Sequence, residues 1–213
     1  MKGKKFAITL LLCTAWALTA GAQNTVESIR KMYQGIHERI RQITPNEEGE
    51  TAYPPVYYDL NIVQNLPGTG PHHENIRMLY DEVETAEDLV YPPHYLNFVT
   101  AKYNFAARQF YEEYLYDDKG QVMFIYAITP DVGDDITPYE LRLWFDGNRL
   151  LRFTAKKAED NWGESENLSG IRFSEEYSGT TIPQKYRQET DRCRERSQRF
   201  LEVFKSIDEN TYL

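Results

Sequence analysis

Residues 108–128 read RQFYEEYLYDDKGQVMFIYAI, and they indicate the architecture of the whole chain. Segments 108–116 and 122–128 are rich in aromatic and β-branched residues, which favour strands. Between them, residues 117–120 (DDKG) place a glycine beside acidic residues, and this composition suits the positive φ of a tight turn. Because a turn this short joins antiparallel strands, the stretch predicts a β-hairpin.

The same period-two pattern continues on both sides of the hairpin, from about residue 56 to residue 156. Further strands are predicted at 57–62, 76–84, 95–103, 139–145 and 150–154. Residues 67–71 (PGTGP) and 146–148 (DGN) have the composition of turns. Six or seven strands with such connections cannot be parallel, because parallel neighbours need long crossovers. The sheet over 56–156 is therefore predicted to be an antiparallel meander.

The alternation gives the predicted sheet two unlike faces. In the central hairpin, Glu113 and Leu115 alternate with Glu112 and Tyr114, and residues 139–145 continue the alternation. One face is apolar, whereas the other is charged and carries scattered aromatic residues. We expect a sheet of this kind to be covered on one side only.

Amphipathic helices are predicted at both ends of the domain. Residues 24–43 carry apolar side chains at steps of three and four, and Pro45 ends the pattern. Residues 183–208 form the second helix, which a proline opens. Residues 157–182 are polar and are interpreted as a loop. The predicted fold class is α+β, with both helices across the apolar face of the sheet.

Residues 1–22 have the layout of a secretory signal peptide. A lysine-rich start precedes an almost unbroken apolar run at 6–18, and residues 20–22 (AGA) offer a small-x-small cleavage site. Cleavage after Ala22 would leave residues 23–213 as a single α+β domain, periplasmic or secreted. The alternative is a lipid anchor on Cys13, although the preceding Leu12 is larger than lipoprotein processing prefers.

Composition limits the partners of the mature chain. The apolar run is shorter than the roughly 20 residues of a membrane-spanning helix, so no membrane insertion is expected. Residues 1–22 hold three lysines and no acid, so their loss changes the formal net charge from −9 to −12. An acidic chain is a poor partner for nucleic acid and for anionic membranes. The 16 tyrosines suit a sheet with one solvated face.

Cleavage would leave Cys193 as the single cysteine, so no internal disulfide is predicted. We interpret it as a small buried apolar residue of the second helix. The alternative is a nucleophile or an intermolecular disulfide, because Arg192, Arg194 and Arg196 would lower the pKa of an exposed thiol.

Two Pro-Pro patterns precede predicted strands, at 53–57 (YPPVY) and 91–95 (YPPHY). Such a sequence is a known ligand of domains that bind polyproline helices. We interpret both copies as extended entries into edge strands, because proline fixes φ and donates no backbone hydrogen bond.

No chemical motif is complete. Residues 72–74 (HHE) place adjacent histidines on opposite faces of a strand, so a zinc site would also need His37 or His94 and a carboxylate. Residues 131–135 (DVGDD) lack the spacing of a calcium loop, and residues 68–70 (GTG) lack the lysine of a phosphate loop. We therefore assign no catalytic, cofactor-binding or metal-ligating residue, and we expect no cofactor.

Two segments carry a resemblance to a group of known proteins: YEEYLYDDKGQ at 111–121 and YELRLWFDGN at 139–148. With the signal peptide and the two terminal helices, they resemble uncharacterised small exported α+β proteins of Bacteroidota gut bacteria. The resemblance covers half the chain and rests on strand and turn chemistry. It implies an exported α+β protein and transfers no functional residue.

The expected function is that of a non-enzymatic binding domain of the periplasm or cell exterior, whose partner is a small apolar ligand or an envelope protein. The alternative is a structural protein that docks on an envelope partner through its aromatic strand face. A glycan- or peptide-directed hydrolase using Asp or Glu is a third hypothesis, although no residue pattern supports it. The oligomeric state is left open.

Overall fold

The structure is a computed structural model that describes residues 24–44, 56–83, 92–130, 132–133, 136–159 and 168–211. The predicted signal peptide, its Cys13 alternative and most of the 131–135 segment lie outside these residues. The elements are α1 (Val26–Ile43), β1 (Tyr57–Leu66), β2 (Gly70–Glu82), β3 (His94–Phe105), β4 (Arg108–Tyr116), β5 (Val122–Thr129), β6 (Tyr139–Asp146), β7 (Arg149–Ala158), η2 (Leu168–Gly170), β8 (Phe173–Gly179), η3 (Gln184–Tyr186) and α2 (Arg187–Asp208).

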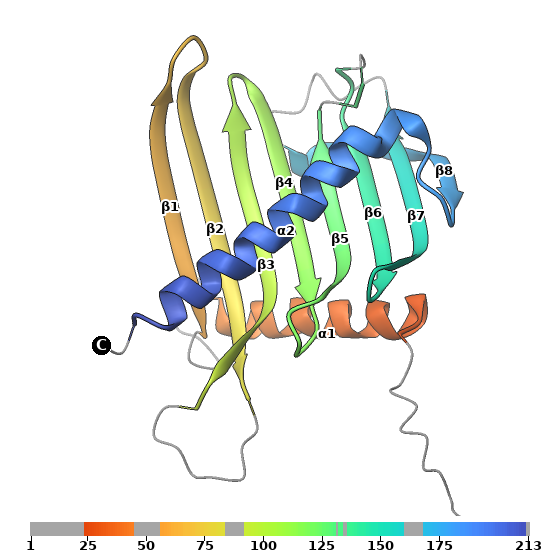
Figure 1. The fold of residues 1–213 in the computed structure, drawn as a ribbon. Coiled ribbons are helices and arrows are strands. Elements are labelled where there is room, and N and C mark those ends of the chain that lie inside the picture. The colour runs from red at the N-terminus through yellow and green to blue at the C-terminus, as the bar shows by residue number, and fades with distance from the viewer. Residues whose placement is uncertain are drawn as a thin grey trace, which may run out of the picture.

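The strands form one antiparallel sheet in which the spatial order is the chain order, β1 to β8 (Figure 1). The predicted meander is confirmed, and so is the predicted hairpin, which β4 and β5 form. Gly120 in its turn adopts φ of +76°, the left-handed conformation that favours glycine. Both Pro-Pro patterns are followed by strands, since β1 begins at Tyr57 and β3 at His94, although residues 53–55 and 91 lie outside the described residues. The expectation of edge strands is confirmed for β1 and wrong for β3, which lies between β2 and β4.

The predicted count of six or seven strands is wrong, because the sheet has eight. The additional strand is β8, which lies in the stretch 157–182 that was interpreted as a loop. Its sequence, FSEEYSG, contains only Phe173 and Tyr177 as apolar residues, and most of its side chains are exposed. An edge strand pairs with one neighbour only, and most of its side chains can stay exposed. Its sequence therefore shows little apolar alternation. It pairs with β7, which itself continues to Ala158.

The two helices lie on opposite faces of the sheet (Figure 1). On one face, α2 packs Cys193, Phe200 and Phe204 into a cluster with apolar residues of β2 to β7. On the other face, α1 packs Ile29 and Ile36 into a separate cluster. The expectation that both helices share the apolar face, and that the other face is uncovered, is therefore wrong.

The physical reason lies in one row of large residues on the face that was expected to be solvated. They are cross-strand partners on five successive strands: Leu79, Phe98, Leu115, Phe124 and Trp144. The isoleucines of α1 cover this row, which removes apolar surface from water. The helix begins with a capping box in which Thr25 and Ser28 satisfy each other's backbone N–H groups.

Within the described part of the chain, no helix is long and apolar enough to cross a membrane.

Candidate functional site: the polar rows of the α1 face

The helix α1 crosses the sheet near one end of the strands (Figure 1). Beyond the apolar row, the strand register defines two further rows on the same face, which we call the polar rows. The row next to α1 contains Asp59, Arg77, Thr100, Glu113, Tyr126, Arg142 and Thr154. The outer row contains Asn61, Asn75, Lys102, Tyr111, Ile128, Glu140 and Lys156.

A pocket of about 560 Å³ lies over the outer row, and we call it the η2 pocket. Its floor comes from β3 to β6: Lys102, Tyr111, Tyr126, Ile128 and Glu140. Its opposite wall is apolar and comes from the segment between η2 and the start of β8: Leu168, Ile171 and Phe173. Its volume lies within the range of small-molecule sites, and its walls combine apolar side chains with a few polar groups, as such sites do.

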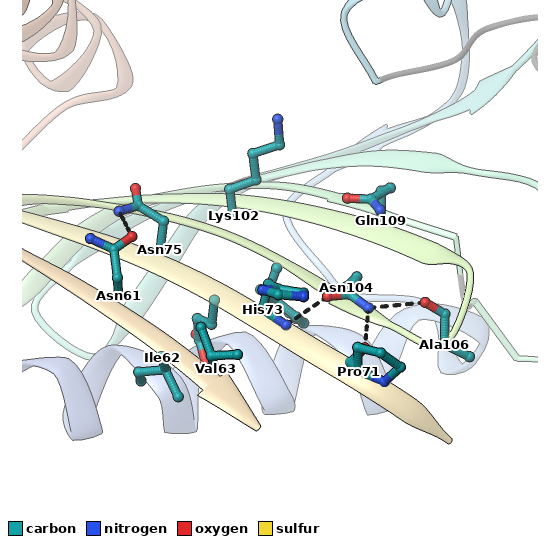
Figure 2. Close-up of a pocket in the computed structure, with 12 residues that line it drawn as sticks. Asn61, Ile62, Val63, Pro71, His73, Asn75, Lys102, Asn104, Ala106 and Gln109 are labelled. Atoms are coloured by element: carbon teal, nitrogen blue, oxygen red, sulfur yellow. Dashed lines mark hydrogen bonds between the residues drawn. The ribbon is translucent and has the colours of Figure 1, made fainter. Parts of the chain in front are cut away.

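A second pocket of about 550 Å³ adjoins it on β1 to β4, and we call it the amide pocket (Figure 2). Its polar lining includes Asn61, Asn75, Asn104 and Gln109. Lys102 lines both pockets, so the two adjoin at this residue.

Hydrogen bonds fix the outer end of the amide pocket. The side chain of Asn104 accepts from the backbone N–H of His73 at 2.7 Å. It also donates to the carbonyls of Pro71 and Ala106, at 2.8 and 3.0 Å (Figure 2). This asparagine therefore ties the β3–β4 turn to the beginning of β2. At the inner end, Asn75 donates to the Asn61 carbonyl oxygen at 2.9 Å.

A buried carboxylate, Glu113, fixes part of the floor of the η2 pocket from the row next to α1. Its side chain is only 4% exposed, and one of its oxygens accepts from the Tyr111 hydroxyl at 2.6 Å. The other oxygen accepts from the hydroxyl of Tyr33 on α1 and lies 3.3 Å from Nε2 of His37. Burial and then the Glu113 charge raise the pKa of both phenols, so they remain protonated donors.

The other carboxylate of the site, Glu140, lines the η2 pocket directly. Its Oε2 accepts from the Tyr126 hydroxyl at 3.3 Å. Its Oε1 lies 3.0 Å from Nε of Arg142 and 3.4 Å from Nζ of Lys156, which are ion pairs without hydrogen-bond geometry. The Arg142 guanidinium also lies over the Tyr126 ring, 5.3 Å from its centroid. Both tyrosines of the floor are thus held by carboxylates.

The opposite face carries a second buried carboxylate cluster, around Glu112. Glu112 is fully buried and accepts from Arg192 at 2.8 Å and from Arg196 at 2.7 Å. It also accepts from the hydroxyls of Tyr103 and Tyr114, at 2.8 and 2.6 Å. Burial alone would raise the pKa of this carboxyl, but the two guanidiniums outweigh burial and hold the pKa below its usual value. The cluster joins α2 to β4.

The histidines considered as metal ligands are not brought together. The Nδ1 of His72 donates to the Asn104 carbonyl at 2.6 Å, whereas His73 lines the amide pocket on the other face. His37 lies on α1 beside Glu113, and His94 lies 2.7 Å from Asp208 of α2. Among the described residues, no three metal-binding side chains form a group.

The interpretation of Cys193 as a buried residue is confirmed. Its side chain is fully buried between α2 and the sheet, and burial raises the pKa of its thiol well above the usual value. It is therefore a neutral packing residue at pH 7 rather than a thiolate nucleophile.

Sequence reasoning assigned none of the residues that line the η2 pocket. Tyr111 and Glu140 belong to the alternation that the sequence shows, so their shared face was available as a signal. The sequence gives no such signal for the apolar wall, because Ile171 and Phe173 lie in a stretch whose composition is that of a loop.

Comparison of the chain with protein-family models, with curated proteins and with solved structures finds no match.

Proposed function

We propose that this chain is a non-enzymatic binding domain of the periplasm or cell exterior, and that it holds a small, partly apolar molecule in the η2 pocket. The observation that carries the proposal is the composition of that pocket. An apolar wall faces a floor of two tyrosines, one lysine and one carboxylate. Few polar groups among apolar walls fix the orientation of a ligand while burial supplies affinity.

The floor is ordered before any ligand arrives, and this supports binding. The hydroxyl of Tyr111 is held by Glu113, and that of Tyr126 by Glu140. Side chains already fixed in place lose little conformational entropy when a ligand binds. The carboxylates therefore fix both tyrosines of the floor, Glu140 from within the floor and Glu113 from the neighbouring row.

The hydrolase alternative gains less support from the same residues. Glycoside hydrolysis uses a pair of carboxyl groups on either side of the scissile bond. Among the described residues that line the η2 pocket, Glu140 is the one carboxylate, and it pairs with Arg142 and Lys156. Glu113 accepts from two phenols and belongs to the row nearer α1. The proposal therefore remains one of binding.

Native mass spectrometry of the protein purified from its own cells tests the proposal. We expect a reproducible additional mass on the wild-type chain, which Phe173→Ala in the apolar wall would reduce. Phe105→Ala is the matched control, because Phe105 is 49% exposed at the end of β3 and lines neither pocket. A bare wild-type mass would contradict ligand carriage and would favour docking on an envelope protein.

A further inference from the structure

We infer that the ligand of the η2 pocket is an amphipathic organic anion, whose negative group lies on Lys102 and whose apolar part lies between Ile128 and the apolar wall. The inference rests on the proposed function and specifies the chemistry of its ligand. It is drawn from the order of side chains along the floor and from the state of their charges.

The chemical type of the side chain in the pocket floor changes from strand to strand. Successive cross-strand partners of the outer row are Lys102 on β3, Tyr111 on β4, Ile128 on β5 and Glu140 on β6. Three strand spacings of about 4.8 Å separate the two charged ends, so the floor is about 14 Å wide. A ligand that covers it meets a cation at one end, a phenol next, and an apolar residue after that.

The cation at the β3 end is available to a ligand. Lys102 is exposed, and within the described part of the chain its ammonium has no ion-pair partner. By contrast, Arg77 in the neighbouring row is paired with Asp59 at 2.8 Å. The carboxylate at the β6 end is already paired with two cations, Arg142 and Lys156. A positive group of a ligand therefore finds no free carboxylate there.

The polar rows are electrically balanced, in contrast to the whole chain. With β8 included, where Glu175 is the partner of Lys156, the two rows hold four cations (Arg77, Lys102, Arg142 and Lys156) and four carboxylates (Asp59, Glu113, Glu140 and Glu175). The whole chain has a formal net charge of −9. A balanced surface on an acidic protein repels an anion less than the rest of the chain does, and three of its four cations already pair with carboxylates, which leaves Lys102 for the ligand.

A neutral donor lies beside the lysine. Gln109 on β4 is diagonal to Lys102 on β3, since the register pairs Asn104 with Gln109 and Lys102 with Tyr111. Figure 2 shows both side chains extending from the same face of the sheet. An ammonium and an amide N–H together suit a group with several acceptor oxygens, such as a carboxylate or a sulfonate.

The test uses two fluorescent probes that share their ring system and differ in charge: anilinonaphthalene sulfonate, which is anionic, and phenylnaphthylamine, which is neutral. Binding of each probe is titrated with wild-type protein and three variants. Lys102→Gln removes the cation. Phe173→Ala removes part of the apolar wall. Lys205→Gln is the matched control, because Lys205 is exposed on α2, on the opposite face.

We expect Lys102→Gln to weaken binding of the sulfonate about two- to fivefold, the range typical of an exposed ion pair, and to leave the neutral probe unchanged. Phe173→Ala should weaken both probes, and Lys205→Gln neither. Raising the salt to about 1 M, where screening acts within about 3 Å, should weaken only the sulfonate.

The failures of the two proposals are distinguishable. If the neutral probe binds and depends on Phe173, but Lys102→Gln leaves the sulfonate unchanged, the anionic ligand class is wrong and the binding function stands. If neither probe binds in a way that depends on Phe173, the η2 pocket is not a ligand site and both proposals are contradicted.

Discussion

Glu112 and Glu113 are adjacent on β4, yet they face different helices and have different partners. Glu112 points to α2, where two guanidiniums and two phenols surround it. Glu113 points to α1, where its donors are two phenols and the imidazole of His37. Two neighbouring buried glutamates thus have different roles. Glu112 is the negative partner in an ionic cluster, whereas Glu113 accepts hydrogen bonds from neutral phenols.

The difference teaches how each helix is attached. A buried ion pair stabilises only while both partners are present, because an unpaired buried charge is costly. The α2 helix is therefore attached to the sheet by the buried ion pairs of Glu112 with Arg192 and Arg196. The phenols around Glu113 are neutral, and one of them continues into the η2 pocket. The α1 helix therefore covers only part of its face of the sheet, next to a surface that is open to ligands.

The largest expected effect is that of Glu112→Gln, which leaves two guanidiniums against a neutral amide. The free energy of unfolding, measured by urea denaturation, should fall by about 3–5 kcal/mol, as when one partner of a buried ion pair is removed. Glu202→Gln is the control, since that carboxylate is exposed on α2 and should change stability by no more than about 0.5 kcal/mol. Equal effects of the two variants would show that the buried ion pairs of Glu112 contribute nothing to the free energy of unfolding.

The second prediction concerns the pH dependence of that loss. The folded-state pKa of Glu112 lies below the unfolded value of about 4.3, so its stabilising contribution is fully present above that value. The contribution is lost as the pH falls through the folded-state pKa. Urea titrations should therefore separate wild type from Glu112→Gln most at neutral pH, and the gap should begin to narrow as the pH falls below the unfolded value of about 4.3. A gap that widens in acid would contradict a lowered pKa.

Glu113→Gln should have a smaller effect, about 1–3 kcal/mol on unfolding, because an amide keeps one acceptor oxygen and loses the other. It should also weaken binding of the neutral probe, since Tyr111 in the pocket floor loses its acceptor. Glu112→Gln, on the opposite face, serves as its control in the binding assay and should leave the probe affinity unchanged under conditions where it is folded. Loss of probe affinity in the Glu112 variant alone would reverse the assignment of the faces.

The smallest expected effect is that of His37→Gln, less than about 1 kcal/mol on unfolding. The His37 side chain is 38% exposed and its contact with Glu113 is 3.3 Å long. Differential scanning calorimetry of this variant next to Glu113→Gln measures the relative weight of imidazole and phenols. An effect as large as that of Glu113→Gln would make the imidazole the main partner of the carboxylate.

The strands and helices follow from sequence because their signals are local. The alternation around Glu112 and Glu113 predicts a hairpin, and the isoleucine stripe of α1 predicts a helix. The face on which α1 packs depends on a row such as Leu79, Phe98 and Leu115, whose members are distant in sequence. Register shifts at Leu79/Tyr80 and Leu115/Tyr116 change the phase of alternation within a strand, so the row is visible only after pairing.

The candidate site is predictable to a smaller extent. The tyrosines of its floor belong to the polar alternation, but a tyrosine on a solvated face has no distinguishing signal. The apolar wall depends on where a segment of low apolar content packs, and Phe173 alone does not indicate this. The two pockets therefore arise from tertiary packing that no single stretch of sequence encodes.

The meander has a consequence for how fast the protein folds. Each strand pairs only with the strands before and after it in the chain, so no strand pairing has to close a long loop. The long closures are those of the helices, as when α1 reaches β6 and α2 reaches β3. Pairing of neighbouring strands can therefore precede docking of the helices. Loss of the Glu112 ion pairs should then accelerate unfolding while leaving the folding rate nearly unchanged.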